Sequence, residues 1–166
     1  MVLDYGQMGI YIREKSIILA FDPGRDKTGF AFADMEGGLL LSGIFPANER
    51  DEFFRSLSAG DVSRWRIEGN GTAFAPSVIA VGDGTYSREF REYVHDRLNA
   101  EVLTVDERNT TLEARGLYWR IHRPGLLMRL LPEGLRVPGR VLDDLAAWAV
   151  ALRALKKYRD INKNKL

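Results

Sequence analysis

Acidic residues stand at the ends of three apolar runs in this sequence: Asp22, Asp83 and the pair Asp106-Glu107. If these runs are neighbouring parallel strands, the acids lie together at the carboxyl edge of the sheet, where open α/β sheets place their sites. Strands are spaced about 5 Å apart, so the carboxylates would be about 5 to 10 Å apart and would repel one another without a cation. Oxygen-preferring Mg²⁺ or Mn²⁺ suits such a cluster, and two ions about 4 Å apart support in-line displacement at phosphorus.

Each acid also has a purely structural interpretation. Asp22 before Pro-Gly, and Asp83 between two glycines, are typical of turns. A further acidic pair, Asp143-Asp144, opens the last predicted helix and is typical of an N-cap or first turn. The coincidence of acids at one sheet edge favours the chemical interpretation, above all for Asp22 and Asp106-Glu107.

The elements that would position these acids follow from hydropathy and turn residues. Apolar runs separated by short turns predict an antiparallel meander of three strands, and two further runs predict parallel strands linked by helices. The strands are expected at residues 17–21, 28–33, 39–45, 78–81 and 102–105, and the helices at 48–58, 86–98, 110–120 and 141–157. Residues 59–77 show no clear pattern, and 121–140 are expected to form a loop. This order predicts an α/β fold with a mixed five-stranded sheet flanked by helices.

Length and composition limit the possible classes of protein. The chain has 166 residues, 45% of them hydrophobic, with no Cys and two His, which suits one domain without disulfides or a zinc site. No apolar run approaches the about 20 residues of a membrane helix, and the N-terminus lacks a signal peptide's apolar core. We expect a cytoplasmic protein with an extension over 1–16, one domain over 17–157 and a basic tail over 158–166.

The net charge of +1 hides an uneven distribution along the chain. Residues 1–107 hold 11 basic and 18 acidic groups, whereas residues 108–140 hold seven Arg and two Glu. Residues 141–166 add six basic and three acidic groups. A basic C-terminal third predicts an anionic partner such as nucleic acid; a solvated surface with internal ion pairs is the alternative.

Most aromatic side chains are expected in the core. Trp65, which lies between Arg64 and Arg66 in a polar stretch, is the candidate for stacking on a nucleic-acid base. His95 and His122 have no partner at a suggestive spacing and are expected at the surface.

Three motifs resemble one family of proteins. They are Asp22-Pro-Gly-x-x-Lys27-x-Gly29, Val105-Asp-Glu-Arg-x-Thr-Thr-x-x-Ala114 and Asp143-x-x-x-Ala147. They look like the YqgF family, RuvC-related nucleases that are also called Holliday junction resolvases or pre-16S rRNA processing nucleases. The resemblance runs from about Ile17 to Leu155. It implies a ribonuclease H-like fold and a Mg²⁺- or Mn²⁺-dependent endonuclease that acts on structured RNA or branched DNA.

The resemblance also implies roles for particular residues. The family's catalytic acids fall on Asp22, on the Asp106-Glu107 pair with Glu107 preferred, and on Asp143. The wider superfamily usually takes its second acid from the region of Asp83, so whether Asp83 supplements or replaces Glu107 stays open. Asp22, Glu107, Asp143 and Asp83 would then hold the metal.

Basic side chains are expected to contact phosphate. Lys27 and Arg108 match basic positions of the family motifs. The Arg-rich segment would add a sequence-independent grip on the backbone through Arg115, Arg120, Arg123 and Arg140.

A non-catalytic nucleic-acid-binding module, like the related domain of the transcription accessory protein Tex, is the alternative. It would need no carboxylate cluster, so the presence of every expected acid favours the enzyme. A branched substrate with two-fold symmetry would favour a homodimer.

Overall fold

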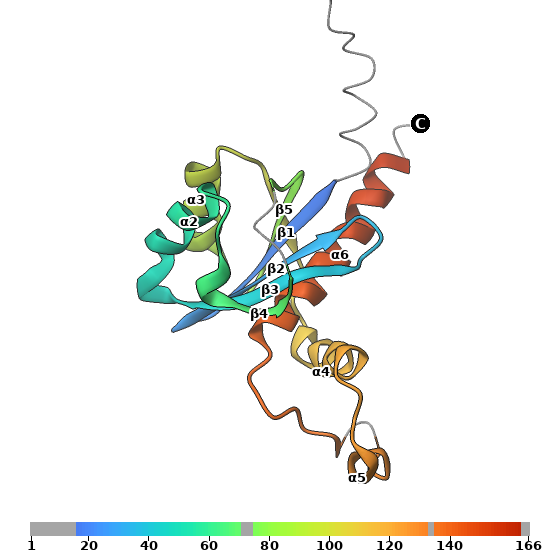
Figure 1. The fold of residues 1–166 in the computed structure, drawn as a ribbon. Helices are drawn as coiled ribbons and strands as arrows, with labels where there is room; N and C mark the ends of the chain where they lie inside the picture. Colours follow the sequence, from blue (N-terminus) through green and yellow to red (C-terminus); the bar gives the residue numbers. More distant parts are fainter. Residues whose placement is uncertain (1–15, 71–74, 133–134, 164–166) are drawn as a thin grey trace, which may run out of the picture.

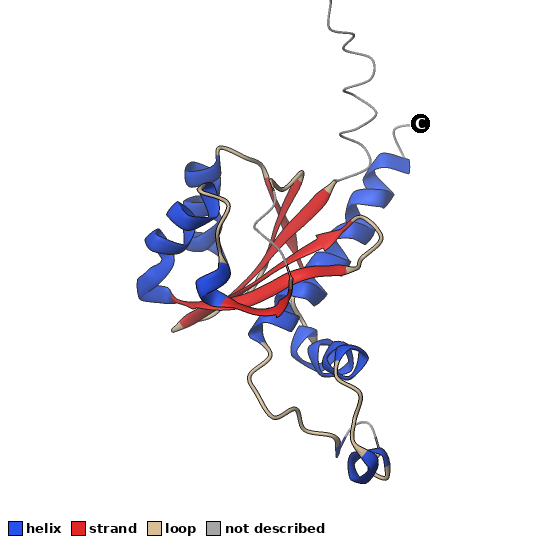
Figure 2. Ribbon diagram, in the orientation of Figure 1, coloured by secondary structure: helices blue, strands red, loops and turns tan. Residues whose placement is uncertain are grey.

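The computed structural model describes residues 16–70, 75–132 and 135–163. A mixed sheet of six strands lies at its centre, with helices on both faces (Figures 1 and 2). The strands are β1 (Ile17–Pro23), β2 (Lys27–Asp34), β3 (Leu39–Pro46), β4 (Arg66–Gly69), β5 (Val78–Gly82) and β6 (Val102–Val105). The helices are α2 (Arg50–Ser58), α3 (Ser87–Leu98), α4 (Thr110–Ile121), α5 (Leu126–Arg129) and α6 (Asp143–Lys163), with short 3-10 turns η1 (Ala47–Glu49) and η2 (Ser63–Trp65).

The strand order β4-β3-β2-β1-β5-β6 places β1 near the middle of the sheet. β1 is antiparallel to β2 and parallel to β5, and β5 is parallel to β6. The meander and the two parallel strands are therefore confirmed, and the arrangement is a ribonuclease H-like fold.

The predicted number of strands was wrong, because β4 adds a sixth strand at the edge next to β3. It lies within residues 59–77, where no pattern was recognised. Its sequence, Arg-Ile-Glu-Gly, is mostly polar and partly exposed. An edge strand open to solvent needs no apolar face, so hydropathy alone carries no signal for it.

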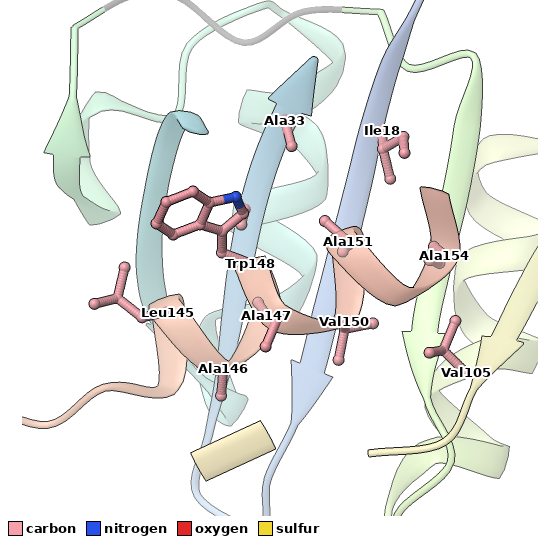
Figure 3. Close-up of a cluster of buried hydrophobic side chains, with 14 of the residues drawn as sticks. Ile18, Ala33, Val105, Leu145, Ala146, Ala147, Trp148, Val150, Ala151 and Ala154 are labelled. Carbon is pink, nitrogen blue, oxygen red and sulfur yellow. The ribbon is translucent and has the colours of Figure 1, made fainter. Parts of the chain in front are cut away.

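Small side chains let α6 lie close to one face of the sheet. Ala147, Ala151 and Ala154 are buried there together with Ile18 and Ala33 of the strands (Figure 3). The closest approach is at Gly29 of β2, where an added Cβ would overlap the carbonyl oxygen of Asp143. The first turn of α6 therefore sits directly on the β1–β2 hairpin.

The opposite face carries α2 and α3 over an aromatic core. Phe21, Phe53 and Phe54 are among its fully buried members. Trp65, the candidate for base stacking, belongs to this core: it is 6% exposed and donates Nε1–H to Glu49 at 2.7 Å. The stacking hypothesis is wrong because η2 turns the indole inward, edge-on to Phe53.

The C-terminal third differs from expectation in two respects. Helix α6 continues to Lys163 instead of ending near Lys157, and the short helix α5 forms within the segment expected to be loop. In Figure 1, α5 lies apart from the sheet. Apart from Ser16, the expected extension over 1–16 lies outside the described residues. In the described part of the chain, no helix is long and apolar enough to cross a membrane.

Candidate active site

Three acids from distant parts of the sequence converge at the carboxyl edge of the sheet. Asp22 is near the end of β1 and pairs with Gly29 across the hairpin. Asp143 is the first residue of α6, whose backbone rests on Gly29. Glu107 follows β6 and turns back over the end of β5, where an added Cβ on Gly82 or Gly84 would meet its carboxylate. The fold therefore brings together the three acids that the family resemblance singles out.

The electrostatics of Asp22 show that these acids interact. Burial, followed by the charges of Glu107 and Asp143, raises its pKa from 3.8 to about 7. The charged form is disfavoured because it is partly removed from water and faces two other carboxylates. A cation at this position would relieve the repulsion.

Glu107 provides a second observation that fits a cation site. Its Oε2 atom is buried and has no hydrogen-bond partner among the described residues. Burial raises the pKa of Glu107; a backbone hydrogen bond from Gly84 offsets part of this, and the charges of Asp83 and Asp106 add to it. Buried carboxylate oxygens are normally paired, so an unpaired one marks a place for a ligand.

Asp83 and Asp106 have different surroundings from Glu107. Asp83 is exposed, and its Oδ1 accepts the backbone N–H of Glu107 at 3.0 Å. Asp106 is exposed and accepts Arg108 Nη2 at 2.7 Å and the Arg108 backbone N–H at 2.9 Å. These bonds lower the pKa of Asp106 to about 2. Asp83 thus supports the loop that carries Glu107. Asp106 is already paired with the guanidinium group of Arg108.

Arg153 of α6 binds the loop that carries Asp106 and Glu107. This role was not recognised in the sequence. Its guanidinium donates to the carbonyl oxygens of Asp106 and Arg108, the latter at 2.7 Å, and to the Glu113 carboxylate. No local signal could have found it, because Arg153 and Arg108 are 45 residues apart.

Lys27, expected to contact phosphate, lies inside the site. Its Nζ is 2.9 Å from Oδ2 of Asp143. The ammonium therefore neutralises one of the three acids and adds a positive charge at the edge where a phosphate would approach.

The donors fit a hard divalent cation in kind. Carboxylate oxygens are the preferred ligands of Mg²⁺ and Mn²⁺. The site offers three carboxylates, and that of Glu107 has an unpaired buried oxygen. As the side chains stand, no group of three acids or histidines within the described ranges is close enough to form a metal cage. Binding would therefore require the carboxylates to move closer together.

Asp144, the neighbour of Asp143, is fully buried in a polar network. It accepts hydrogen bonds from Ser42 Oγ at 2.8 Å and from Arg140 Nη1 at 2.7 Å. Arg140 also donates to Glu68 of β4 at 2.6 Å, and Glu68 contacts His122 Nε2 at 2.7 Å. Arg140, expected at the nucleic-acid surface, is thus engaged within the protein. His122, for which no partner was foreseen, has one.

The other expected nucleic-acid contacts lie on or next to α4. Arg115 and Arg120 of α4 are exposed, as are Arg108 before it and Arg123 after it. These side chains are free to meet a polyanion, although Arg108 also pairs with Asp106.

The charge on Asp22 is expected to destabilise the metal-free protein. Its folded pKa of about 7 exceeds the unfolded value of 3.8, so the folded state binds more protons between these values. Stability therefore falls as pH rises through this window. We expect Asp22→Asn to stabilise the protein by about 4 kcal/mol at pH 8 and by less than about 1 kcal/mol at pH 4. Urea unfolding in EDTA at both pH values measures this, and an equal effect at both would contradict it.

The domain thus has a ribonuclease H-like fold with an acid cluster at the carboxyl edge of its sheet. Comparisons with known proteins report only distant similarities. No family model and no curated protein matches the chain. Its structure is similar to that of T. thermophilus RuvC in complex with a Holliday junction substrate. The identity is 19%, the match covers 87% of this chain and 96% of RuvC, and the TM-score is 0.47. A ROK family transcriptional regulator, a homologue of the E. coli MLC protein, is 12% identical over 63% of this chain and 31% of its own, with a TM-score of 0.39.

Proposed function

We propose that this chain is a divalent-metal-dependent endonuclease of the YqgF family that hydrolyses phosphodiester bonds in structured nucleic acid. The substrate would be the 5′ end of a 16S rRNA precursor or a Holliday junction, both found in the cytoplasm. The observation that carries the proposal is the convergence of Asp22, Glu107 and Asp143 at one sheet edge. The raised pKa of Asp22 and the unpaired Oε2 of Glu107 support a cation site at this edge.

Each residue of the site has a role in this proposal. Asp22, Glu107 and Asp143 would hold Mg²⁺ or Mn²⁺, which supplies Lewis-acid activation of water and charge stabilisation at the leaving oxygen when bound. Asp83 fixes the backbone of Glu107 through a hydrogen bond of 3.0 Å. Lys27 places an ammonium at the same edge, where it would contact a phosphate of the substrate.

The exposed arginines on and around α4 would bind the nucleic-acid backbone. Contacts to phosphate carry no sequence information, so they suit an enzyme that recognises the shape of its substrate. A Holliday junction has two-fold symmetry and would favour a homodimer, whereas an rRNA end would not require one.

The experiment compares the wild type with Asp22→Asn on a 5′-extended 16S rRNA precursor and on a four-way DNA junction. Each is incubated with Mg²⁺, Mn²⁺ or EDTA. We expect metal-dependent cutting of one substrate by the wild type and none by Asp22→Asn. Asp26→Asn is the matched control, since this acid is exposed in the same hairpin turn.

The second candidate is a nucleic-acid-binding module without catalysis. The Lys27–Asp143 ion pair favours it, because the lysine already neutralises one of the acids. Equal binding of these substrates by wild type and Asp22→Asn, without cutting under any metal condition, would establish this candidate and reject the nuclease.

A further inference from the structure

A cleft lies near the same end of β1 as Asp22, but on the opposite face of the sheet. Successive side chains of a strand point to opposite faces. Ile18 and Ala20 belong to the core under α6, whereas Leu19 and Phe21 belong to the core under α2 and α3. Asp22 therefore faces α6, and Pro23 faces α2 and α3. Pro23 lines a cleft of about 260 Å³ between the β1–β2 turn and the starts of α2 and α3.

Two arginines give this cleft a charge opposite to that of the acid cluster. Arg25, on the β1–β2 turn, is exposed and makes no hydrogen bond or ion pair with any residue that the structure describes. Arg50 lies over the Tyr93 ring at 4.2 Å and is 3.3 Å from Oε1 of Glu89. The stacking fixes Arg50 in place, while Arg25 has all its donors available. Two guanidinium groups against one carboxylate favour an anion.

Tyr86 adds an aromatic surface to the same cleft. It precedes α3, is 47% exposed, and has no hydrogen bond with any described residue. An exposed ring beside arginine side chains is a combination with which proteins bind single-stranded nucleic acid, since bases stack on aromatic faces while cations hold the backbone.

We propose that this cleft binds one unpaired nucleotide next to the phosphate that is cut at Asp22. Arg25 and Arg50 hold its phosphate, and Tyr86 stacks on its base. The location of the cut rests on the proposed function; the binding itself does not. The substrate is therefore unpaired at this position, as at a junction or a single-stranded end.

The test measures affinity in EDTA, where no metal-dependent cutting can occur. The probes are fluorescein-labelled single strands of RNA and of DNA with one sequence, and the corresponding duplexes, followed by fluorescence anisotropy. We expect Arg25→Ala and Tyr86→Ala each to weaken single-strand binding about tenfold, with Tyr86→Phe close to wild type. Arg25→Ala should also reduce the slope of log binding constant against log salt concentration by about one, the value for one lost phosphate contact. The RNA and DNA arms show which sugar the cleft accepts.

Two control variants remove an arginine and a tyrosine outside the cleft, to match Arg25→Ala and Tyr86→Ala. Arg88→Ala removes an exposed arginine of α3 that does not line the cleft, and Tyr158→Ala removes a partly exposed tyrosine near the far end of α6. Both are expected to bind within about twofold of wild type, since neither side chain lines the cleft. Thermal unfolding of each variant confirms that it is folded.

The outcomes separate this inference from the nuclease proposal. A wild type that binds single strands but cuts nothing, with Arg25→Ala and Tyr86→Ala weakened, supports the cleft and rejects the nuclease. A wild type that cuts while both variants bind normally overturns the cleft. The cleft is also overturned if no probe binds, if duplexes bind as tightly as single strands, or if free AMP displaces the strand as effectively as an unlabelled oligonucleotide does.

Discussion

Glu107→Gln is expected to reduce metal-dependent cleavage on the order of 100-fold or more while leaving nucleic-acid binding intact. Gln has the shape of Glu but not its charge, so the cluster would lose an anionic oxygen that neutralises a divalent cation. The loss should be large because Oε2 of Glu107 has no other partner in the described structure. Single-turnover cleavage at saturating enzyme measures the chemical step apart from binding.

Asp106→Asn is the matched control, since it removes the neighbouring charge. Asp106 is exposed and bound to Arg108, and the hydrogen bonds from Arg108 hold its pKa at about 2. We expect cleavage within about threefold of wild type, because removing an exposed ion pair has small effects. If Asp106→Asn were inactive and Glu107→Gln active, the assignment of the second acid would be reversed.

Gly29→Ala is expected to destabilise the protein by about 3 kcal/mol or more. A Cβ at this position would overlap the carbonyl oxygen of Asp143, which is backbone and cannot rotate away. The first turn of α6 would have to move off the β1–β2 hairpin and carry Asp143 with it. Urea unfolding should show the loss of stability, and cleavage should fall even under conditions where the variant is folded.

Gly116→Ala provides the control for this substitution. Gly116 lies in α4, and a Cβ there meets no other atom within 4 Å. Replacing a helical glycine by alanine should stabilise the protein by about 0.5 to 1 kcal/mol. If the two variants had similar stability, the close approach of α6 to β2 would not be what places Asp143.

The amino-acid sequence contains most of the fold because buried strands have a local signature. The five strands with apolar runs were predicted from hydropathy, and their antiparallel or parallel direction followed from turn lengths and from the need for helical crossovers. Asp22 could be placed at the carboxyl edge for the same reason. The strand β4 could not be predicted, since Arg66, Glu68 and Gly69 show no apolar pattern.

The family resemblance preferred Glu107 to Asp106, but only the tertiary structure gave the physical reason for distinguishing these neighbouring acids. Asp106 and Glu107 are adjacent, yet Arg108 pairs with one while Gly82 and Gly84 leave room for the other. The position of their loop depends on Arg153, which comes from another helix.

The same holds for other polar partners. Trp65 is turned into the core by η2, and Arg140 is bound by Asp144 and Glu68, which is 72 residues away. Hydropathy reports which face of an element is buried, because burial repeats with the period of the element. The choice of a partner depends on distances between atoms from distant segments, and those distances exist only once the helices have packed on the two faces of the sheet.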